Sequence, residues 1–176
     1  MAGAVEAGVA PSTVPGAVPG VRAARLIAAV RTWRPSYVAL LLSALAAGLD
    51  AVLWGLGPPS VGLVVAGAVF AVAGLTWLLW SAALLHAART PIRVGDMPLV
   101  LIEEGPYRLG RHPMYLGGMV SMLGTALVLA SPSMVLATAA FAGMVARVHV
   151  PHEEAWLQAR FGGWYRDYAG AVRRWL

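Results

Sequence analysis

The chain contains no cysteine and no lysine, and it has few charged residues of any kind. The lack of cysteine excludes disulfides, thiolate metal sites and a cysteine nucleophile. Only 12% of the 176 residues are charged, against 59% that are hydrophobic, whereas a soluble domain usually carries about a quarter charged residues. Such a chain cannot cover a globule with polar surface, so we expect it to be an integral membrane protein.

Familiar active-site motifs of soluble enzymes are also missing. The sequence has no Gly-x-Ser-x-Gly nucleophile elbow, no phosphate-binding loop and no Gly-x-Gly-x-x-Gly dinucleotide fingerprint. A Rossmann-type cofactor site is therefore excluded at the level of motifs, and a serine nucleophile has no support.

Four apolar stretches are long enough to be membrane spans. A spanning helix needs about 20 apolar residues, because the hydrocarbon core is roughly 30 Å thick and the helix rises about 1.5 Å per residue. We predict an all-α integral membrane fold with four transmembrane helices, at about residues 36–56, 61–88, 113–130 and 134–150. The "SPS" turn at 131–133 is so short that the third and fourth spans must form an antiparallel helical hairpin.

Two further segments complete the predicted organisation. Residues 1–34, which begin with a low-complexity run of Ala, Gly, Val and Pro, are expected to be a disordered or interfacial cytoplasmic N-terminal arm. Residues 35–176 are expected to form one membrane domain, which closes with an amphipathic, aromatic-rich cytoplasmic C-terminal segment after the fourth span.

All thirteen positive charges are arginines, and they fall on one side of the predicted fold. They precede the first span, fill the loop at 89–112 and follow from the end of the fourth span, whereas the two opposite turns hold none. Because positively charged loops remain on the cytoplasmic side, both termini are predicted to be cytoplasmic. The absence of lysine and the abundance of Ala and Gly indicate a GC-rich genome. The expected location is the inner (plasma) membrane of a bacterium.

The stretch "GPYRLGRHPMYLGG" at 105–118 places a polar cluster directly against an apolar span. Pro113 suits the first position of the third span, because its missing N–H costs nothing there. Arg111 and His112 then flank a helix N-terminus, whose free N–H groups and dipole attract anions. The small residues that follow from Gly117 admit two interpretations: a packing face against a neighbouring helix, or a surface on which a flat ligand approaches the backbone.

A second polar stretch, "RVHVPHEE" at 147–154, ends the fourth span. Because the third and fourth spans form a hairpin, both polar stretches must meet at its cytoplasmic end. The converging side chains are Arg111, His112, Tyr115, Arg147, His149, Glu153 and Glu154. Each has a simpler explanation alone, since acids favour a helix start and arginines mark the inner border, but the joint clustering indicates a site.

Metal binding is the obvious rival, because His149, His152 and Glu153 resemble a ligand set. The chain has only four histidines, however, fewer than the several His-rich boxes of membrane di-iron enzymes. We therefore predict no metal site, and no nucleic-acid partner either.

Taken together, the two stretches resemble the integral-membrane methyltransferases, a group that includes isoprenylcysteine carboxyl methyltransferases and phospholipid N-methyltransferases. The shared pattern is G-P-Y-x-x-x-R-H-P-x-Y-x-G, then a helical hairpin, then E-E-x-x-L-x-x-x-F-G-x-x-Y-x-x-Y. The chain meets every letter, with Gly105, Pro106, Tyr107, Arg111, His112, Pro113, Tyr115 and Gly117, then Glu153, Glu154, Leu157, Phe161, Gly162, Tyr165 and Tyr168. The similarity covers roughly residues 76–176, except that the family's Val-Pro-Arg-like tail is Val172-Arg173-Arg174 here.

The resemblance implies that S-adenosylmethionine binds at the cytoplasmic membrane border. Arg111 and His112 would hold the cofactor's carboxylate, and a glutamate would accept from the ribose hydroxyls or lie near the sulfonium. The complete predicted cofactor set is Tyr107, Arg111, His112, Tyr115, Gly117, Gly118, His149, Glu153, Glu154, Tyr165 and Tyr168, with Tyr115, Tyr165 and Tyr168 beside the adenine. The predicted catalytic residues are Arg147, Glu153 and Glu154.

The expected methyl acceptor is a lipophilic small molecule in the bilayer. Arg147 suits the carboxylate of an isoprenylated compound, whereas a glutamate suits a lipid amine, and the sequence leaves both open. Two other functions also stay open: an NADPH-dependent membrane reductase of the sterol type, whose C-terminal part has a related His-x-x-Tyr-x-Gly stretch, and a non-catalytic lipid-binding protein. Asp50, a carboxylate inside the first span, is placed outside the site.

Overall fold

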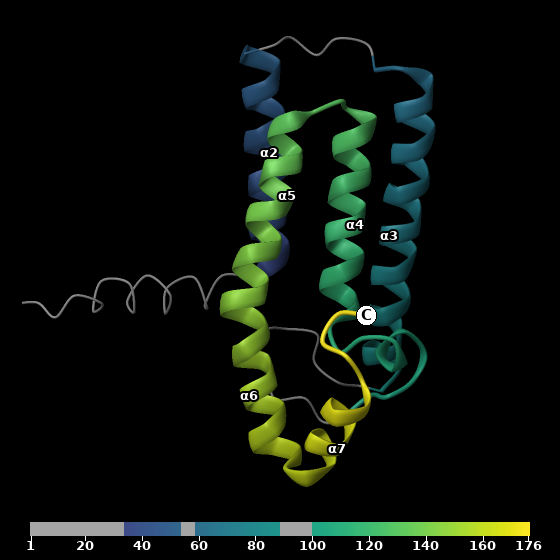
Figure 1. The fold of residues 1–176 in the computed structure, drawn as a ribbon, viewed down its shortest axis with the longest axis vertical. Coiled ribbons are helices and arrows are strands. Elements are labelled where there is room, and N and C mark those ends of the chain that lie inside the picture. The colour runs from purple at the N-terminus through teal and green to yellow at the C-terminus, as the bar shows by residue number, and fades with distance from the viewer. Residues whose placement is uncertain (1–33, 54–58, 89–99) are drawn as a thin grey trace, which may run out of the picture.

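The computed structural model describes residues 34–53, 59–88 and 100–176, and this part of the chain is helical throughout, with no strand. Four long helices run alternately up and down (Figure 1): α2 (Pro35–Leu53), α3 (Val61–Ala87), α4 (Pro113–Val128) and α5 (Pro132–Met144). α2 packs against α5, α5 against α4, and α4 against α3. The predicted antiparallel hairpin of the third and fourth helices is present, and the predicted N-terminal arm lies almost wholly outside the described residues.

Three helical stretches within the described ranges are long and apolar enough to cross a membrane. They are Pro35–Leu53, Val61–Ala87 and Pro132–Phe161, whereas α4 has only 16 residues. Large apolar side chains on α2 and α3 face outward, with Val52 82% and Leu40 67% exposed. Exposure of such surfaces to water is unfavourable, whereas lipid covers them readily. The prediction of an all-helical integral membrane protein with apolar spans is confirmed.

Glycines bring α3 and α4 into backbone contact. A methyl group added to Gly117 would lie 2.7 Å from both the Gly74 carbonyl oxygen and the Leu78 nitrogen, and one on Gly67 would lie 2.6 Å from the Gly124 carbonyl oxygen. The packing interpretation of the small-residue face is therefore confirmed. The prediction that a flat ligand lies against Gly117 is corrected, because the backbone of α3 already occupies that space.

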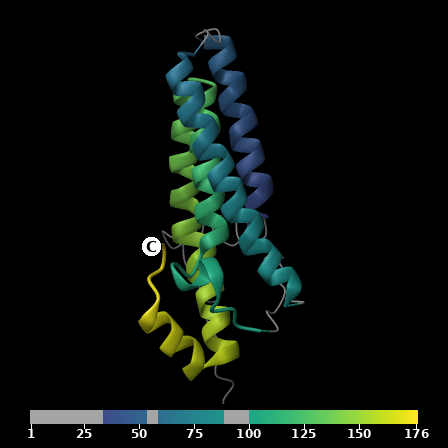
Figure 2. The same cartoon turned by 90° about the vertical axis from the view of Figure 1, so that its right-hand side faces the viewer.

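The last membrane helix does not stop where the apolar run ends. A π-helical turn, η2 (Val145–His149), joins α5 to α6 (Val150–Phe161) without a break. Pro151 lies just after this π-helical turn, at the start of α6. Gly162, with φ of 56°, then reverses the chain into α7 (Gly163–Ala171), and Figure 2 shows α7 turned back beside α6.

At the opposite end of the bundle, the carboxylate of Asp50 fastens α2 to the α4–α5 turn. Asp50 is buried and accepts hydrogen bonds from the hydroxyls of Ser131 and Ser133. The Ser131 hydroxyl also accepts from the Met134 backbone nitrogen at 3.1 Å, so it caps α5 as well. Asp50 thus has polar partners of its own and lies far from the polar end of α4, which agrees with its placement outside the site.

Candidate functional site

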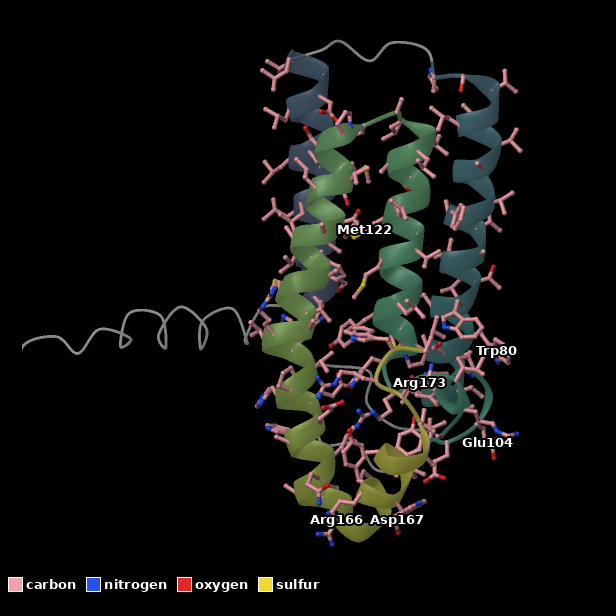
Figure 3. The ribbon with its side chains drawn as sticks, viewed as in Figure 1. Trp80, Glu104, Met122, Arg166, Asp167 and Arg173 are labelled. Atoms are coloured by element: carbon pink, nitrogen blue, oxygen red, sulfur yellow. The ribbon has the colours of Figure 1, made fainter. Side chains whose placement is uncertain are left out.

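Three segments meet at the end of the bundle where α4 begins: the start of α4, the first turns of α6 and the residues after α7 (Figure 3). His112 is the residue before α4, and its ring is buried, with 3% of the residue exposed. Both ring nitrogens face carboxylates, Nδ1 lying 3.6 Å from Glu153 and Nε2 3.2 Å from Glu154. The two glutamates are neighbours at the start of α6, so His112 joins the two predicted motifs directly.

Glu154 is fully engaged by cationic partners. Its carboxylate lies 3.3 Å from the Arg111 guanidinium and 3.2 Å from the His112 ring, and it accepts two hydrogen bonds from Arg174, at 2.6 and 3.1 Å. Only 14% of the Glu154 side chain is exposed. A carboxylate with three such partners holds three segments together, and it has little capacity left for a ligand.

Glu153 has a different environment from its neighbour. Half of its side chain is exposed, and its partners are the His112 ring at 3.6 Å and the Tyr115 hydroxyl. The carboxylate therefore keeps free acceptor positions. Of the two adjacent glutamates, Glu153 is the one available to a cation or a diol.

The pKa of His112 reflects its position between the two carboxylates. Burial alone would lower this pKa, but the contacts with Glu153 and Glu154 outweigh burial and raise it above the usual 6.5. The imidazolium form therefore contributes stability that is fully present below pH 6.5 and is lost as the pH rises through the raised value.

We accordingly expect the ring resonances of His112 to titrate with a midpoint above 6.5 in NMR spectra of the ¹⁵N-histidine-labelled protein. In Glu154→Gln the midpoint should fall, because one of the two stabilising charges is gone. A midpoint below 6.5 in the unmodified protein would contradict this charge arrangement.

Tyr107 and Tyr168 fix the short 3₁₀ turn η1 (Gly105–Arg108). The Tyr107 hydroxyl donates to the Ser81 carbonyl of α3 at 3.4 Å, and the Tyr168 hydroxyl donates to the Tyr107 carbonyl at 2.7 Å. Burial raises the pKa of both hydroxyls above the usual range, so both remain neutral donors. Their hydroxyls are committed to the backbone, which leaves only their ring faces for the predicted cofactor contact.

Tyr165 is the tyrosine of α7 that approaches the polar cluster. Its ring is buried beside that of Tyr168, with centroids 6.2 Å apart, and packs with Leu101. Burial raises the pKa of the Tyr165 hydroxyl, while the nearby Arg111 opposes that rise. Tyr165 therefore lies next to Arg111 as a neutral and buried phenol, and its contact with the cofactor stays a prediction.

The two remaining predicted residues on the last helix differ sharply. His149 is 2% exposed, and neither ring nitrogen has a hydrogen-bond partner among the described residues. Arg147 is exposed. Its guanidinium lies beside Gly143, one turn earlier on the same helix, because a methyl group added to Gly143 would lie 3.0 Å from the Arg147 Nη1 atom. The structure thus brings His149 into the protein interior and does not bring Arg147 to the glutamates, so the predicted catalytic role of Arg147 has no geometric support.

The segment after α7 supplies residues that the sequence analysis missed. The Arg111 nitrogen donates to the Arg173 carbonyl at 3.1 Å, the Arg174 guanidinium binds Glu154, and the Trp175 ring lies 6.0 Å from the His112 ring. The Trp175 carbonyl group lies against Gly110, so a residue with a side chain would not fit at this position. Only the arginine pair at 173–174 hinted at this contact, and no local signal in the sequence shows that Gly162 folds the segment back over His112.

Comparisons with known proteins show which proteins the chain is similar to. The family model described as "Phospholipid methyltransferase" matches residues 63–163. Protein-S-isoprenylcysteine O-methyltransferase A of Arabidopsis thaliana is 36% identical over 72 residues, which cover 41% of this chain and 36% of the plant protein. A probable protein-S-isoprenylcysteine O-methyltransferase of Oryza sativa subsp. indica is 39% identical over 79 residues, 43% of this chain and 40% of the rice protein.

The chain thus spans about two fifths of the length of these curated relatives. The family match, in contrast, covers more than half of the chain and includes α3, the His112 region, the hairpin and both glutamates. By this match, the chain belongs to the phospholipid methyltransferase family.

Proposed function

We propose that the protein transfers a methyl group from S-adenosylmethionine to a lipophilic acceptor held in the membrane. One observation carries the proposal: the Arg111–His112 pair at the start of α4 converges with Glu153 and Glu154 at the start of α6. Membership of the phospholipid methyltransferase family supports it. The domain that performs this chemistry is proposed to be residues 35–176.

The groups at this end of the bundle fit the chemistry of the methyl donor, which has a sulfonium, a ribose diol, a carboxylate and an adenine. The half-exposed Glu153 suits the cation or the diol. The Arg111 guanidinium has a buried Nε without a partner among the described residues, so it retains donors for a carboxylate. The Tyr115 and Trp175 rings, each with its centroid about 6 Å from that of the buried His112 ring, offer aromatic surface to adenine.

Methyl transfer needs alignment and exclusion of water more than it needs covalent help. When bound, the donor supplies an electrophilic methyl carbon on sulfur, and the protein supplies binding and electrostatics. Glu153 would orient the positive end of the donor, while Glu154 keeps Arg111, His112 and Arg174 in place. Trp175 packs against the apolar cluster of Val38, Met122, Phe141, Val145 and Val150 and would separate the polar end from the bilayer core.

The site is proposed to lie at the cytoplasmic membrane border. With 16 residues, α4 covers about 24 Å, less than the roughly 30 Å of the hydrocarbon core. If α4 crosses the membrane as the three longer helices do, its polar start is drawn toward the hydrocarbon, where a lipophilic acceptor can reach it. The bundle end with Asp50 and the α4–α5 turn would then face away from the cytoplasm.

This orientation can be tested with single cysteines, because the chain has none of its own. In intact cells or right-side-out vesicles, we expect a membrane-impermeant maleimide to label Ser60→Cys and to spare Arg166→Cys. Permeabilised membranes should label both variants, which controls for access to the thiols. The reverse pattern in sealed membranes would overturn the proposed topology.

The transfer activity itself is tested with methyl-labelled S-adenosylmethionine and membranes that contain the protein. Label should enter an organic-extractable product, and Glu153→Gln should reduce this transfer by at least about tenfold, since one lost charge-assisted contact is worth about 1.5–3 kcal/mol. Glu104→Gln, at an exposed carboxylate outside the cluster, is the matched control and should transfer normally. No labelled lipid in any membrane would contradict the proposed activity.

A further inference from the structure

The residues that follow α7, 172–176, form a strap across the polar end of the bundle. α7 ends at Ala171, and Val172 has an extended conformation that takes the chain out of the helix. The rest of the strap has no helical structure and runs back toward the start of α4 (Figure 1). Terminal residues without regular structure are ordered only where contacts hold them, so the contacts of the strap determine whether it stays in place.

The backbone of the strap lies directly against the turn that precedes α4. The Arg111 main-chain nitrogen donates to the Arg173 carbonyl oxygen at 3.1 Å. The Trp175 carbonyl group lies against Gly110, where the absence of a side chain allows this close approach. The Trp175 ring lies 6.0 Å from the buried ring of His112. The strap therefore covers the residues at which the proposed donor site begins.

Two buried polar groups beside the strap have no hydrogen-bond partner. They are the Nε atom of Arg111 and the hydroxyl of Tyr165, each without a partner within the described ranges of the chain. Tyr165 interacts electrostatically with Arg111 and with Arg174 of the strap, so these groups lie close together. Buried polar groups almost always have a partner, so these two need an explanation. A polar ligand bound next to the strap would satisfy both.

The ion pair that holds the strap can break without leaving a buried charge alone. Arg174 donates to both oxygens of Glu154, at 2.6 and 3.1 Å, yet 46% of the Arg174 side chain is exposed. Water can replace Glu154 at such a guanidinium, so the pair stabilises the closed strap only modestly. When Arg174 moves away, the Glu154 carboxylate still has Arg111 at 3.3 Å and the His112 ring at 3.2 Å.

We propose that the strap is a gate through which the methyl donor enters and leaves, and that Arg174 is a positioning residue that keeps this gate closed through Glu154. The inference rests on the proposed methyltransferase function and adds the control of donor exchange at the same site. The closed strap keeps water from the bound donor, as active-site lids do. The open strap uncovers Arg111 and Tyr165.

The test measures how fast S-adenosylhomocysteine binds to and leaves the detergent-purified protein, followed by stopped-flow tryptophan fluorescence. Arg174→Gln removes the charge that holds the strap, so the open form becomes more populated. We expect association and dissociation both to become about tenfold faster, which corresponds to about 1.4 kcal/mol of lost ion-pair stabilisation. Because a gate changes both rates alike, the dissociation constant should stay within about threefold. Arg174→Lys keeps the charge without the guanidinium fork and should give intermediate rates.

Arg173→Gln is the matched control at the neighbouring position of the strap. It removes the same charge from an exposed side chain. Arg173 contacts the bundle through its carbonyl oxygen, which the substitution leaves in place. Both rates should therefore equal those of the unmodified protein, which separates the ion pair of Arg174 from a general effect of lost positive charge.

Hydrogen–deuterium exchange gives a second measurement that needs no cofactor. The Arg111 amide hydrogen is bonded to the strap, so its exchange reports how often the strap opens. In Arg174→Gln this amide should exchange about tenfold faster than in Arg173→Gln, the same factor as for the binding rates.

The outcomes that would overturn the gate differ from those that would end the methyltransferase function. Unchanged binding rates in Arg174→Gln would show that the donor does not pass the strap, whatever the amide exchange does. Faster dissociation with unchanged or slower association would make Arg174 a donor-contacting residue instead. Both results leave the methyltransferase function intact, whereas failure of the unmodified protein to bind S-adenosylhomocysteine at all would end both proposals.

Discussion

Glu154→Ala is expected to destabilise the protein and to abolish cofactor binding together. The Glu154 carboxylate is the shared partner of Arg111, His112 and Arg174, and removing one partner of a buried ionic network costs about 3–5 kcal/mol. Because the Arg174 side chain is 46% exposed, we expect the lower end, about 3 kcal/mol. This corresponds to a fall of about 6–12 °C in the thermal midpoint for a chain of this length and to a loss of at least about 100-fold in affinity for S-adenosylhomocysteine.

Thermal unfolding followed by tryptophan fluorescence is a suitable measurement, since Trp175 lies beside His112. Glu153→Gln should keep the thermal midpoint within about 1–2 °C and lose affinity only, because Glu153 is half exposed and has fewer partners. Equal midpoints for Glu154→Ala and the unmodified protein would show that the Glu154 network does not hold the three segments together.

Gly117→Val is expected to force α3 and α4 apart. A side chain at this glycine would meet the Gly74 carbonyl oxygen and the Leu78 nitrogen at 2.7 Å, and neither backbone can yield as a flexible side chain would. Overpacking costs about 1–3 kcal/mol in ordinary cores. Because Gly117 faces rigid backbone atoms, we expect Gly117→Val to cost about 3 kcal/mol or more. This corresponds to a fall of at least about 6 °C in the thermal midpoint.

Gly118→Val is the matched control on the same helix. A methyl group on Gly118 meets only the Leu78 Cδ1 atom, at 3.7 Å, which is ordinary contact. Its thermal midpoint should stay within about 2 °C of the unmodified protein, since both substitutions change helix propensity alike. If the two variants melt together, close α3–α4 packing is not what requires glycine at 117.

The sequence predicted most of the helical architecture because membrane spans have a strong local signal. Apolar length placed α2 and α3 to within about three residues, and Pro113 placed the start of α4. The continuation of the last helix through Pro151 to Phe161 was harder to predict. The apolar run ends at Val150, but the helix continues. The π-helical turn at Val145–His149 departs from the regular hydrogen-bond pattern just before Pro151, where the proline's N–H is missing.

The sequence predicted which residues gather at the site, but it did not predict which of them bind one another and which remain available to a ligand. A hairpin brings 111–115 and 149–154 together whatever the side chains do, so the cluster followed from topology. Which of two adjacent glutamates is free depends on Arg174, and that contact requires the chain reversal at Gly162. Arg147 was expected at the site from charge and proximity in sequence, but the helix carries its side chain outward.

The roles of small residues on a membrane helix also depend on contacts that the sequence does not show. Gly117 and Gly118 are adjacent and look equivalent in the sequence, and both fit a packing face or a ligand face. Only the position of α3 distinguishes them, since it covers Gly117 with backbone and leaves Gly118 near a single leucine methyl. Helix propensity and periodicity do not indicate which neighbouring helix packs against each of these glycines.

The central claim is that the polar end of α4 and α6 binds S-adenosylmethionine, and calorimetry of the detergent-purified protein tests it most directly. Titration with S-adenosylhomocysteine should give saturable binding, while NADPH gives none and Glu153→Gln weakens the interaction. Saturable binding of NADPH without binding of S-adenosylhomocysteine would contradict the account and favour a reductase. Binding of neither would leave a family member without the family's cofactor, and the proposed site would have to be abandoned.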